Sequence, residues 1–420
     1  MAEKETLWNH RDFLNVWGAE TISVFGSQFY LLAMPLAAVI ILDANAAEMG
    51  LLFAVEMLPF LIFGLFAGVL ADRIRRRTIM IACDIARAGV LAAIPLAWYF
   101  DLLSWPVMLG VAFSAGVFTA FFDIAYQAYL PVLVKHSQLL DANSKLETSR
   151  ASSQVAGPSL AGVVVDVIGA PFAMAANSLS FLGSAFLLLR VKKRELVERV
   201  KTSKSVLCEI KEGLSIVLRN KMLRGIAGCT ATANLFGSMS MAILMLFMED
   251  TLGLTPSLIG VIFAGGALGA VLGAVTSSRV VARLGLGKTI VVSAFVSGVP
   301  VGLEALAYPS NALILMIALM FVGGFLMVVY NVNQVSLRQS ITPDNLQGKM
   351  NATMRFIVWG VFPAGGIIGG ILGEAVGLRM TIIISAIGTL ASGLWVALSP
   401  VNDLKSLPSE PAKDSQLSTG

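Results

Sequence analysis

The chain has 420 residues, of which 56% are hydrophobic and only 13% charged, and its mean hydropathy is +0.80. A soluble domain is about 45–50% apolar and about 25% charged, so this composition excludes a water-soluble globular protein and requires a lipid bilayer as solvent. The net charge of +4 does not by itself indicate a nucleic-acid partner, because its placement along the chain matters more than its sum. Three scattered cysteines and two histidines predict unpaired thiols and no metal site.

The N-terminal segment MAEKETLWNHRDFLNVW has no short apolar core followed by a small-residue cleavage site. It therefore does not read as a cleaved signal peptide, and the first apolar run is long enough to remain in the membrane. A spanning helix needs roughly 20 mostly apolar residues, and these runs are too long for barrel strands. The sequence predicts an all-α membrane protein with twelve spans, at 13–41, 49–70, 78–99, 105–130, 146–168, 172–190, 223–248, 256–278, 288–307, 311–336, 348–373 and 378–399.

The basic residues predict the orientation of these spans, because Lys and Arg concentrate in cytoplasmic loops. With both termini on one side of the membrane, 28 of the 30 Lys and Arg residues fall on that side. Arg379 alone falls on the other side, and Arg87 lies within a span. We therefore expect a multi-pass protein of a bacterial-type plasma (inner) membrane with both termini in the cytoplasm.

The longest polar stretch, 190–224, separates six spans from six. It predicts a six-helix bundle at 1–190, a cytoplasmic central loop at 191–222, a second six-helix bundle at 223–400 and a disordered tail at 401–420. Apolar residues recur at helical spacing from Val206 to Leu218 among charges, which indicates an amphipathic helix on the inner membrane surface. For the first half of the loop, a solvated linker is equally compatible with the sequence.

The two halves resemble each other in sequence. Arg150 is followed eight residues later by Pro158, and Arg355 is followed eight residues later by Pro363. In both halves, small residues and a short turn come next. An offset of 205 residues, close to half the chain, indicates a duplicated six-helix unit of the kind found in transporters.

The loop after the second span reads Gly68-Val-Leu-Ala-Asp72-Arg73-Ile-Arg75-Arg76-Arg77. It resembles the signature of the major facilitator superfamily, except that Arg75 stands where a glycine is usual. The segment GPSLAG, which contains Gly157, Pro158 and Gly162, is similar to the antiporter motif of drug exporters, with Ala161 in place of a glycine. Longer stretches of the N-terminal half resemble the exporter branch that includes macrolide efflux proteins and the enterobactin exporter.

This resemblance implies the major facilitator fold and roles for several residues. It implies a cytoplasmic latch, in which a carboxylate of the fourth span meets the arginines of the signature loop. The implied latch residues are Gly68, Asp72, Arg73, Arg76, Arg77 and Asp123.

Charges within spans are costly and are therefore functional candidates. Glu56 has no basic residue within one helical turn, so it could exchange a proton or neutralise a cationic substrate, and a protonated structural Glu is the alternative. Glu20 and Asp123 are further proton-coupling candidates, although each could be a merely local polar group. Asp84 and Arg87, three residues apart, share a helix face and are expected to form a structural ion pair.

Polar and aromatic residues near the middle of several spans are candidates for a substrate cavity, although helix packing would also explain them. These candidates are Gln28, Phe29, Tyr30, Asn234, Phe236, Asn331 and Gln334. No glycine-rich loop ends in Lys-Ser or Lys-Thr, so no ATP phosphate cradle, cofactor or enzymatic chemistry is expected.

The function that fits these features is secondary active transport. The expected protein is a proton-coupled antiporter that exports an amphipathic organic compound, such as a drug, antibiotic or siderophore, by alternating access. An importer of a small metabolite, a lipid flippase, or a non-transporting membrane sensor remains an alternative on the same fold. The expected partners are a small-molecule substrate, protons and the bilayer, with no nucleic acid, and the protein is expected to be monomeric.

Overall fold

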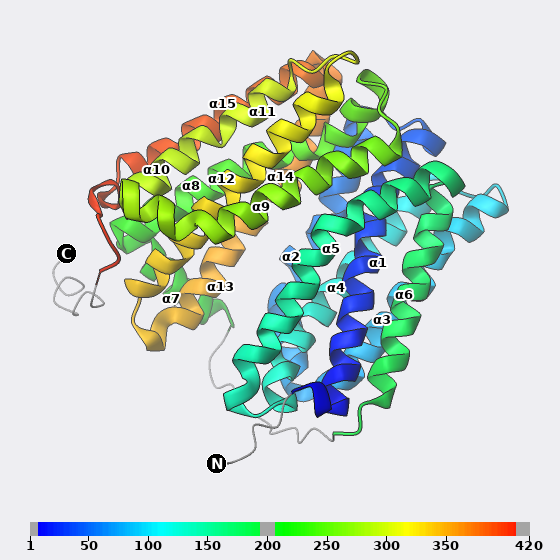
Figure 1. Ribbon diagram of the computed structural model, residues 1–420, viewed down its shortest axis with the longest axis horizontal. Coiled ribbons are helices and arrows are strands. Elements are labelled where there is room, and N and C mark those ends of the chain that lie inside the picture. The colour runs from blue at the N-terminus through cyan, green and yellow to red at the C-terminus, as the bar shows by residue number, and fades with distance from the viewer. Residues whose placement is uncertain (1–6, 194–205, 409–420) are drawn as a thin grey trace. The chain divides into compact units, whose positions relative to one another are not determined.

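The computed structural model describes residues 7–193 and 206–408, without the side chains of residues 64–73, 136, 206–211 and 345. Every secondary-structure element in these ranges is a helix (Figure 1). The chain divides into two compact units. Unit 1 comprises Met1–Lys201 and Met245–Ala264, and unit 2 comprises Thr202–Leu244 and Gly265–Gly420.

Unit 1 contains a bundle of six long helices that run alongside one another (Figure 1). Helix α1 packs against α5 and α6, α3 packs against α4 and α6, and α2 packs against α4. The helices are α1 (Arg11–Leu42), α2 (Ala46–Arg73), α3 (Arg76–Tyr99), α4 (Trp105–Leu133), α5 (Leu139–Ile168) and α6 (Ala170–Arg190).

Local sequence signals set the ends of these helices. At the start of α2, Asn45 and Glu48 cap each other reciprocally, with N–H to side-chain oxygen distances of 3.0 and 2.9 Å. Gly169 joins α5 to α6 with φ of 91°, and Gly377 makes the corresponding turn in the second half with φ of 86°. Residues with a side chain rarely adopt this φ, so both copies of the repeat use glycine for the same turn.

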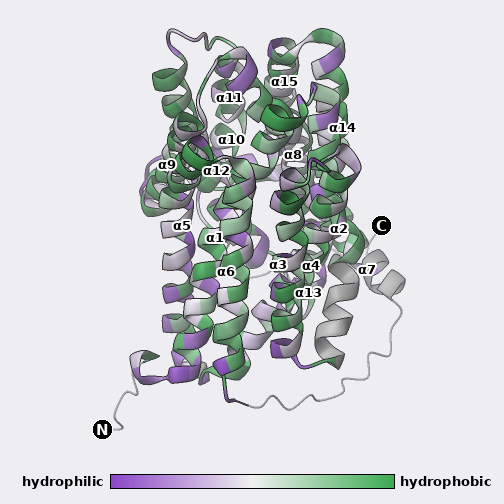
Figure 2. Ribbon diagram, turned by 90° about the vertical axis from the view of Figure 1, so that its right-hand side faces the viewer, coloured by the Kyte–Doolittle hydropathy of each residue, from purple (hydrophilic) through white to green (hydrophobic). Residues whose placement is uncertain are grey.

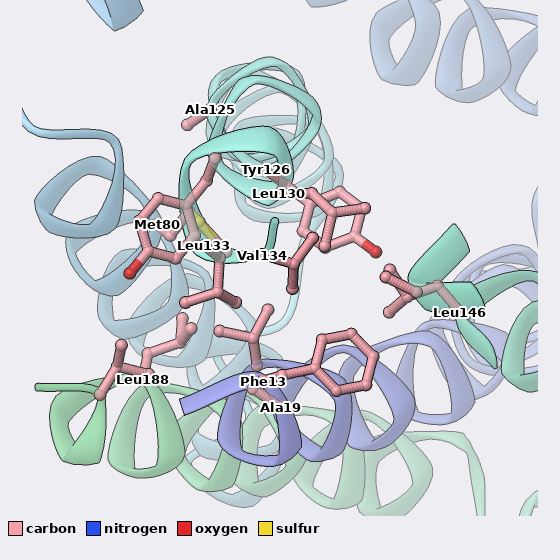
Figure 3. Close-up of a cluster of buried hydrophobic side chains, with 14 of the residues drawn as sticks. Phe13, Ala19, Met80, Ala125, Tyr126, Leu130, Leu133, Val134, Leu146 and Leu188 are labelled. Carbon is pink, nitrogen blue, oxygen red and sulfur yellow. The ribbon is translucent and has the colours of Figure 1, made fainter. Parts of the chain in front are cut away.

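A cluster of buried apolar side chains fills the end of the unit 1 bundle at which α1 begins (Figure 3). Phe13 of α1, Met80 of α3 and Leu133 of α4 contribute to it, and each is at most 1% exposed. Leu146 and Leu188 bring α5 and α6 into the same cluster. Because lipid tails are as apolar as these side chains, close packing rather than escape from water stabilises the contact.

Unit 2 holds the remaining helices except for residues 245–264, which belong to unit 1, and two of its spans are broken. The span Leu286–Glu304 divides into α10 (Leu286–Val296) and α11 (Gly298–Glu304), and the span Leu346–Val376 contains the break between α13 (Asp344–Gly360) and α14 (Phe362–Val376). Pro300 and Pro363 follow the two breaks, and proline lacks the N–H that would continue the hydrogen-bond ladder. The other helices of the second half are α7 (Val206–Arg219), α8 (Lys221–Leu246), α9 (Pro256–Leu284), α12 (Ala312–Ser340) and α15 (Leu378–Ala397).

Within the described residues, twelve helical segments are long and apolar enough to cross a membrane, which confirms the predicted all-α membrane fold. Figure 2 shows long hydrophobic stretches along the helices and hydrophilic residues gathered where α1 begins. The predicted boundaries differ from the helix ends by up to seven residues, and the largest difference is at α5, which begins at Leu139 instead of residue 146, so Lys145 lies in a helix. The first turns of α5 contain polar residues, so the apolar run used to predict the span begins later than the helix does.

The segment of the predicted amphipathic helix forms α7, and its place on a membrane surface stays a prediction. It packs against α13, where Glu212 forms an ion pair with Lys349. Val217 is 0% exposed and belongs to the core of unit 2, whereas Leu214 and Leu218 are 38% and 47% exposed. The first half of the predicted linker and most of the predicted tail lie outside the described residues.

Candidate transport site

Tyr30 and Glu56 form a hydrogen-bonded pair between α1 and α2. The Tyr30 hydroxyl donates to Glu56 Oε1 at 2.7 Å, and both side chains are half-buried. Helix α4 approaches the backbone of α2 at this position so closely that a Cβ on Gly116 would lie 2.9 Å from the Glu56 carbonyl oxygen. Within the described residues, no cationic side chain pairs with Glu56, so its partner there is the neutral hydroxyl of Tyr30.

Glu20 has a partner that the sequence prediction did not assign to it. Arg150 of α5 donates to Glu20 Oε1 of α1 at 3.2 Å. The Glu20 side chain is 5% exposed, whereas that of Arg150 is 41% exposed. Asp123 and Arg87 also act on Glu20 electrostatically, so Glu20 belongs to a charge network rather than standing alone.

A pocket of about 430 Å³ lies between α4 and α5 beside this network. Tyr126 and Arg150 line it, together with Gln127 and Glu147. The Arg150 guanidinium lies 5.9 Å from the centre of the Tyr126 ring. Arg150 thus holds the buried Glu20 and also faces an open space large enough for a small organic group.

Asp84 and Arg87 form a buried ion pair within α3. Asp84 is 0% and Arg87 is 3% exposed. The guanidinium carbon of Arg87 lies 4.2 Å from the centre of the Phe122 ring and 4.0 Å from that of Phe181, so two aromatic faces enclose the cation. This enclosure supports a structural role, which stays a prediction.

The signature loop joins α2 to α3. The side chains of Gly68, Asp72 and Arg73 lie outside the described residues, and Arg76 and Asp123 are half-buried. The latch therefore stays a prediction for these five residues.

Arg77 binds the last turn of α6. Its Nε donates to the Leu188 carbonyl at 2.9 Å, and its Nη2 donates to the Leu189 carbonyl at 2.8 Å. Carbonyls at a helix C-terminus lack partners within the helix and attract cations. One of the four arginines in the loop is therefore engaged with the end of α6.

We expect Arg77→Ala to lower the stability of the protein by about 1–2 kcal/mol, since two charge-assisted hydrogen bonds are lost at a half-buried site. The midpoint of thermal unfolding of the purified protein would measure this change. Arg75→Ala is the matched control, because Arg75 is exposed. Equal midpoints for the two variants would show that the contact with α6 contributes nothing.

The glycines of the antiporter-like motif allow close helix contacts. A Cβ on Gly157 would lie 2.4 Å from Cγ of Gln28, which places that cavity candidate against α5. A Cβ on Gly162 would lie 2.4 Å from the carbonyl oxygen of Pro256, the first residue of α9. Pro158 is buried within α5. Both glycines are required here for space, because helices approach one another closely only where side chains are absent.

The remaining cavity candidates lie on three helices, α1, α8 and α12. Asn331 accepts a hydrogen bond from Gln334 Nε2 at 2.8 Å, so these two lie together on α12. Asn234 of α8 instead donates to the Val358 carbonyl at 2.9 Å, next to the break between α13 and α14. A Cβ on Gly388 would lie 2.1 Å from Cγ of the Phe236 ring, so Phe236 packs against α15 at that glycine. Phe29 is half-buried on α1.

Two charged residues were missed by the sequence reasoning. Arg150 was noticed as a marker of the repeat, and its opposite charge to Glu20 was the available signal for pairing them. Glu304 lies at the end of α11 and is 5% exposed. The sequence could have indicated Glu304 as a candidate, because it is a carboxylate inside the predicted span 288–307. Within the part of the chain that the structure describes, no group of three or more His, Cys, Asp or Glu side chains could hold a metal ion.

The twelve spans and the charged groups between helices define a multi-pass membrane protein, and the family model and relatives given next identify it as a transporter of the major facilitator type. The family model described as transmembrane secretion effector matches residues 7–418. The chain belongs to this family.

Two relatives of the chain are named as efflux proteins. Macrolide efflux protein A of Streptococcus pyogenes is 25% identical over 414 residues, which cover 96% of this chain and 99% of the relative. The multidrug efflux pump Tap of Mycolicibacterium fortuitum is 25% identical over 369 residues, with 85% and 88% of the two chains covered.

Solved structures share the fold at lower identity. A bacterial homologue of the iron transporter ferroportin in an inward-facing state has a TM-score of 0.75 at 15% identity, with 94% of this chain and 99% of that chain covered. A bacterial homologue of the lysosomal transporter Spinster, inward-facing and occupied, has a TM-score of 0.74 at 13% identity, with 94% and 97% covered. These likenesses show the fold alone.

Proposed function

We propose that the protein is a proton-coupled antiporter that exports an amphipathic organic compound by alternating access, as a monomer in a bacterial-type inner membrane with both termini in the cytoplasm. The observation that carries this proposal is the pair of Tyr30 and Glu56. A carboxylate within the membrane that has a neutral donor, and no cation, as its partner can hold either a proton or a cationic group of a substrate. Competition between the two for one carboxylate gives exchange rather than co-transport.

The charge network of unit 1 supports the same mechanism. Glu20 and Arg150 connect α1 to α5, and α5 also carries the antiporter-like motif. Asp123 acts electrostatically on both members of this pair, which supports it as a third proton-coupling candidate. Protonation of a carboxylate there would weaken an attachment between helices, and this is the kind of change that biases one transport state over another.

The cytoplasmic latch belongs to this proposal. Asp72 lies in the last turn of α2. The C-terminus of a helix carries partial negative charge, which disfavours a carboxylate there unless cations compensate. In the proposed cycle, the arginines of the signature loop and Asp123 supply contacts that form in one state and break in the other.

The proposal is tested in everted membrane vesicles that contain the full-length protein. With an imposed proton gradient, the vesicles should accumulate erythromycin or ethidium, and a protonophore should abolish the accumulation. Expression in a strain that lacks its own drug pumps should raise resistance to the transported compound. Accumulation that ignores the proton gradient would refute proton coupling, and absence of accumulation for every amphipathic probe would refute export.

A further inference from the structure

A stripe of polar side chains follows one face of α12. Tyr330, Gln334 and Arg338 are spaced four residues apart, so they lie one above another along the helix. Successive members are separated by about 6 Å along the axis. Mean hydropathy is high along the span Ala312–Ser340, so a row of polar side chains on one face of this helix is unexpected unless they have a specific role.

Two of the polar side chains in the stripe form hydrogen bonds with neighbouring side chains. The hydroxyls of Tyr330 and Thr230, on α12 and α8, lie 2.7 Å apart and share a hydrogen bond. Gln334 Nε2 donates to Asn331 Oδ1 at 2.8 Å. Gln334 is 3% exposed, whereas Asn331 is exposed. Polar side chains inside spans face the interior of a helix bundle or a water-filled cavity far more often than lipid, so Asn331 supports a polar environment on this face of α12.

Two buried polar atoms of the stripe meet no partner within the described residues. These are the acceptor Oε1 of Gln334 and the donor Nε of Arg338. An unpaired buried polar atom costs about 1–3 kcal/mol, and proteins keep few such atoms. Arg338 interacts electrostatically with Tyr330 and with no acidic side chain of the described residues. The stripe thus offers one acceptor and one donor on adjacent helical turns.

We propose that Tyr330, Gln334 and Arg338 form a hydrogen-bonding site in unit 2 for an oxygen-rich organic molecule that carries hydroxyl and carbonyl groups. This inference rests on the proposed export function and specifies the class of substrate. A hydroxyl of the ligand donates to Gln334 Oε1, and a carbonyl or hydroxyl oxygen accepts from Arg338 Nε. Glu56 in unit 1 takes a cationic group, whereas the α12 site recognises neutral oxygens.

The test compares two probes with the purified full-length protein in lipid nanodiscs. Erythromycin carries several hydroxyl and carbonyl groups, whereas ethidium is an organic cation with neither. Gln334→Leu should weaken the binding of erythromycin roughly tenfold, because a site built for a hydroxyl loses its acceptor, and should leave ethidium binding unchanged. Gln339→Leu is the matched control, since Gln339 is exposed on the same helix.

Arg338→Met provides a second variant if Gln334→Leu fails to fold, and it should show the same selective loss. Equal weakening of both probes would show a structural role and overturn the proposal, as would unchanged erythromycin binding in both variants. A wild-type protein that binds ethidium but not erythromycin would overturn the α12 site and leave export intact. A wild-type protein that neither binds nor accumulates either probe would refute the export function, and the α12 site with it.

Discussion

Glu56→Gln should abolish substrate accumulation driven by a proton gradient while the protein still folds. Glutamine preserves the shape of the side chain and its hydrogen bond with the Tyr30 hydroxyl, but it can neither release a proton nor carry a charge. Everted vesicles with an imposed gradient measure the effect directly. The loss should be complete because an exchanger without its exchanging group has no means to couple the two fluxes.

Glu374→Gln is the matched control for this substitution, since Glu374 is an exposed carboxylate on α14. It should transport at the wild-type rate. Tyr30→Phe removes the donor to Glu56 and keeps the aromatic ring, so transport should continue at a reduced rate. Gradient-driven accumulation by Glu56→Gln at the wild-type rate would exclude Glu56 as the coupling site.

Arg87→Leu should destabilise the protein by about 3–5 kcal/mol, because it leaves the buried Asp84 carboxylate without its cation. Asp84 is 0% exposed, and within the described residues Arg87 is the cation that pairs with it, whereas Ser184 offers only a neutral hydroxyl. Asp84→Ala should be comparably damaging, since it leaves the guanidinium enclosed by Phe122 and Phe181 without its counter-ion. Thermal unfolding of purified protein, together with the yield of folded protein, measures both changes.

The double variant Asp84→Ala with Arg87→Leu separates structure from mechanism. Removing both charges of a buried pair is often neutral for stability, so the double variant should be markedly more stable than either single variant. It should also transport, if the pair is only structural. A stable double variant without gradient-driven transport would instead place Asp84 in the proton pathway.

Hydropathy predicted most of the fold because a bilayer constrains a sequence strongly. A helix must cross about 30 Å of hydrocarbon, so each span leaves a long apolar run in the sequence, and its ends carry Lys and Arg. The start of α5 was placed too late for the same reason, since its first turns are polar and lie beyond the apolar run. The hydropathy pattern also did not predict the helix breaks at Ser297 and Val361, because the apolar run continues through both positions unchanged.

Spacing along one helix also predicted some of the candidate site. Asp84 and Arg87 are three residues apart, so a single turn of α3 brings them together whatever the neighbouring helices do. Asn331 and Gln334 follow the same rule on α12, although their contact was not foreseen.

The sequence by itself determined that the chain is an all-α membrane protein with twelve spans, because the number and length of apolar runs are properties of the chain alone. Only the tertiary structure decided that Glu56 meets Tyr30, that Glu20 meets Arg150 and that Arg77 binds the end of α6. These partners are separated by 26, 130 and 111 positions in the sequence. Such contacts depend on how each helix is rotated and which neighbour it faces, and packing sets both.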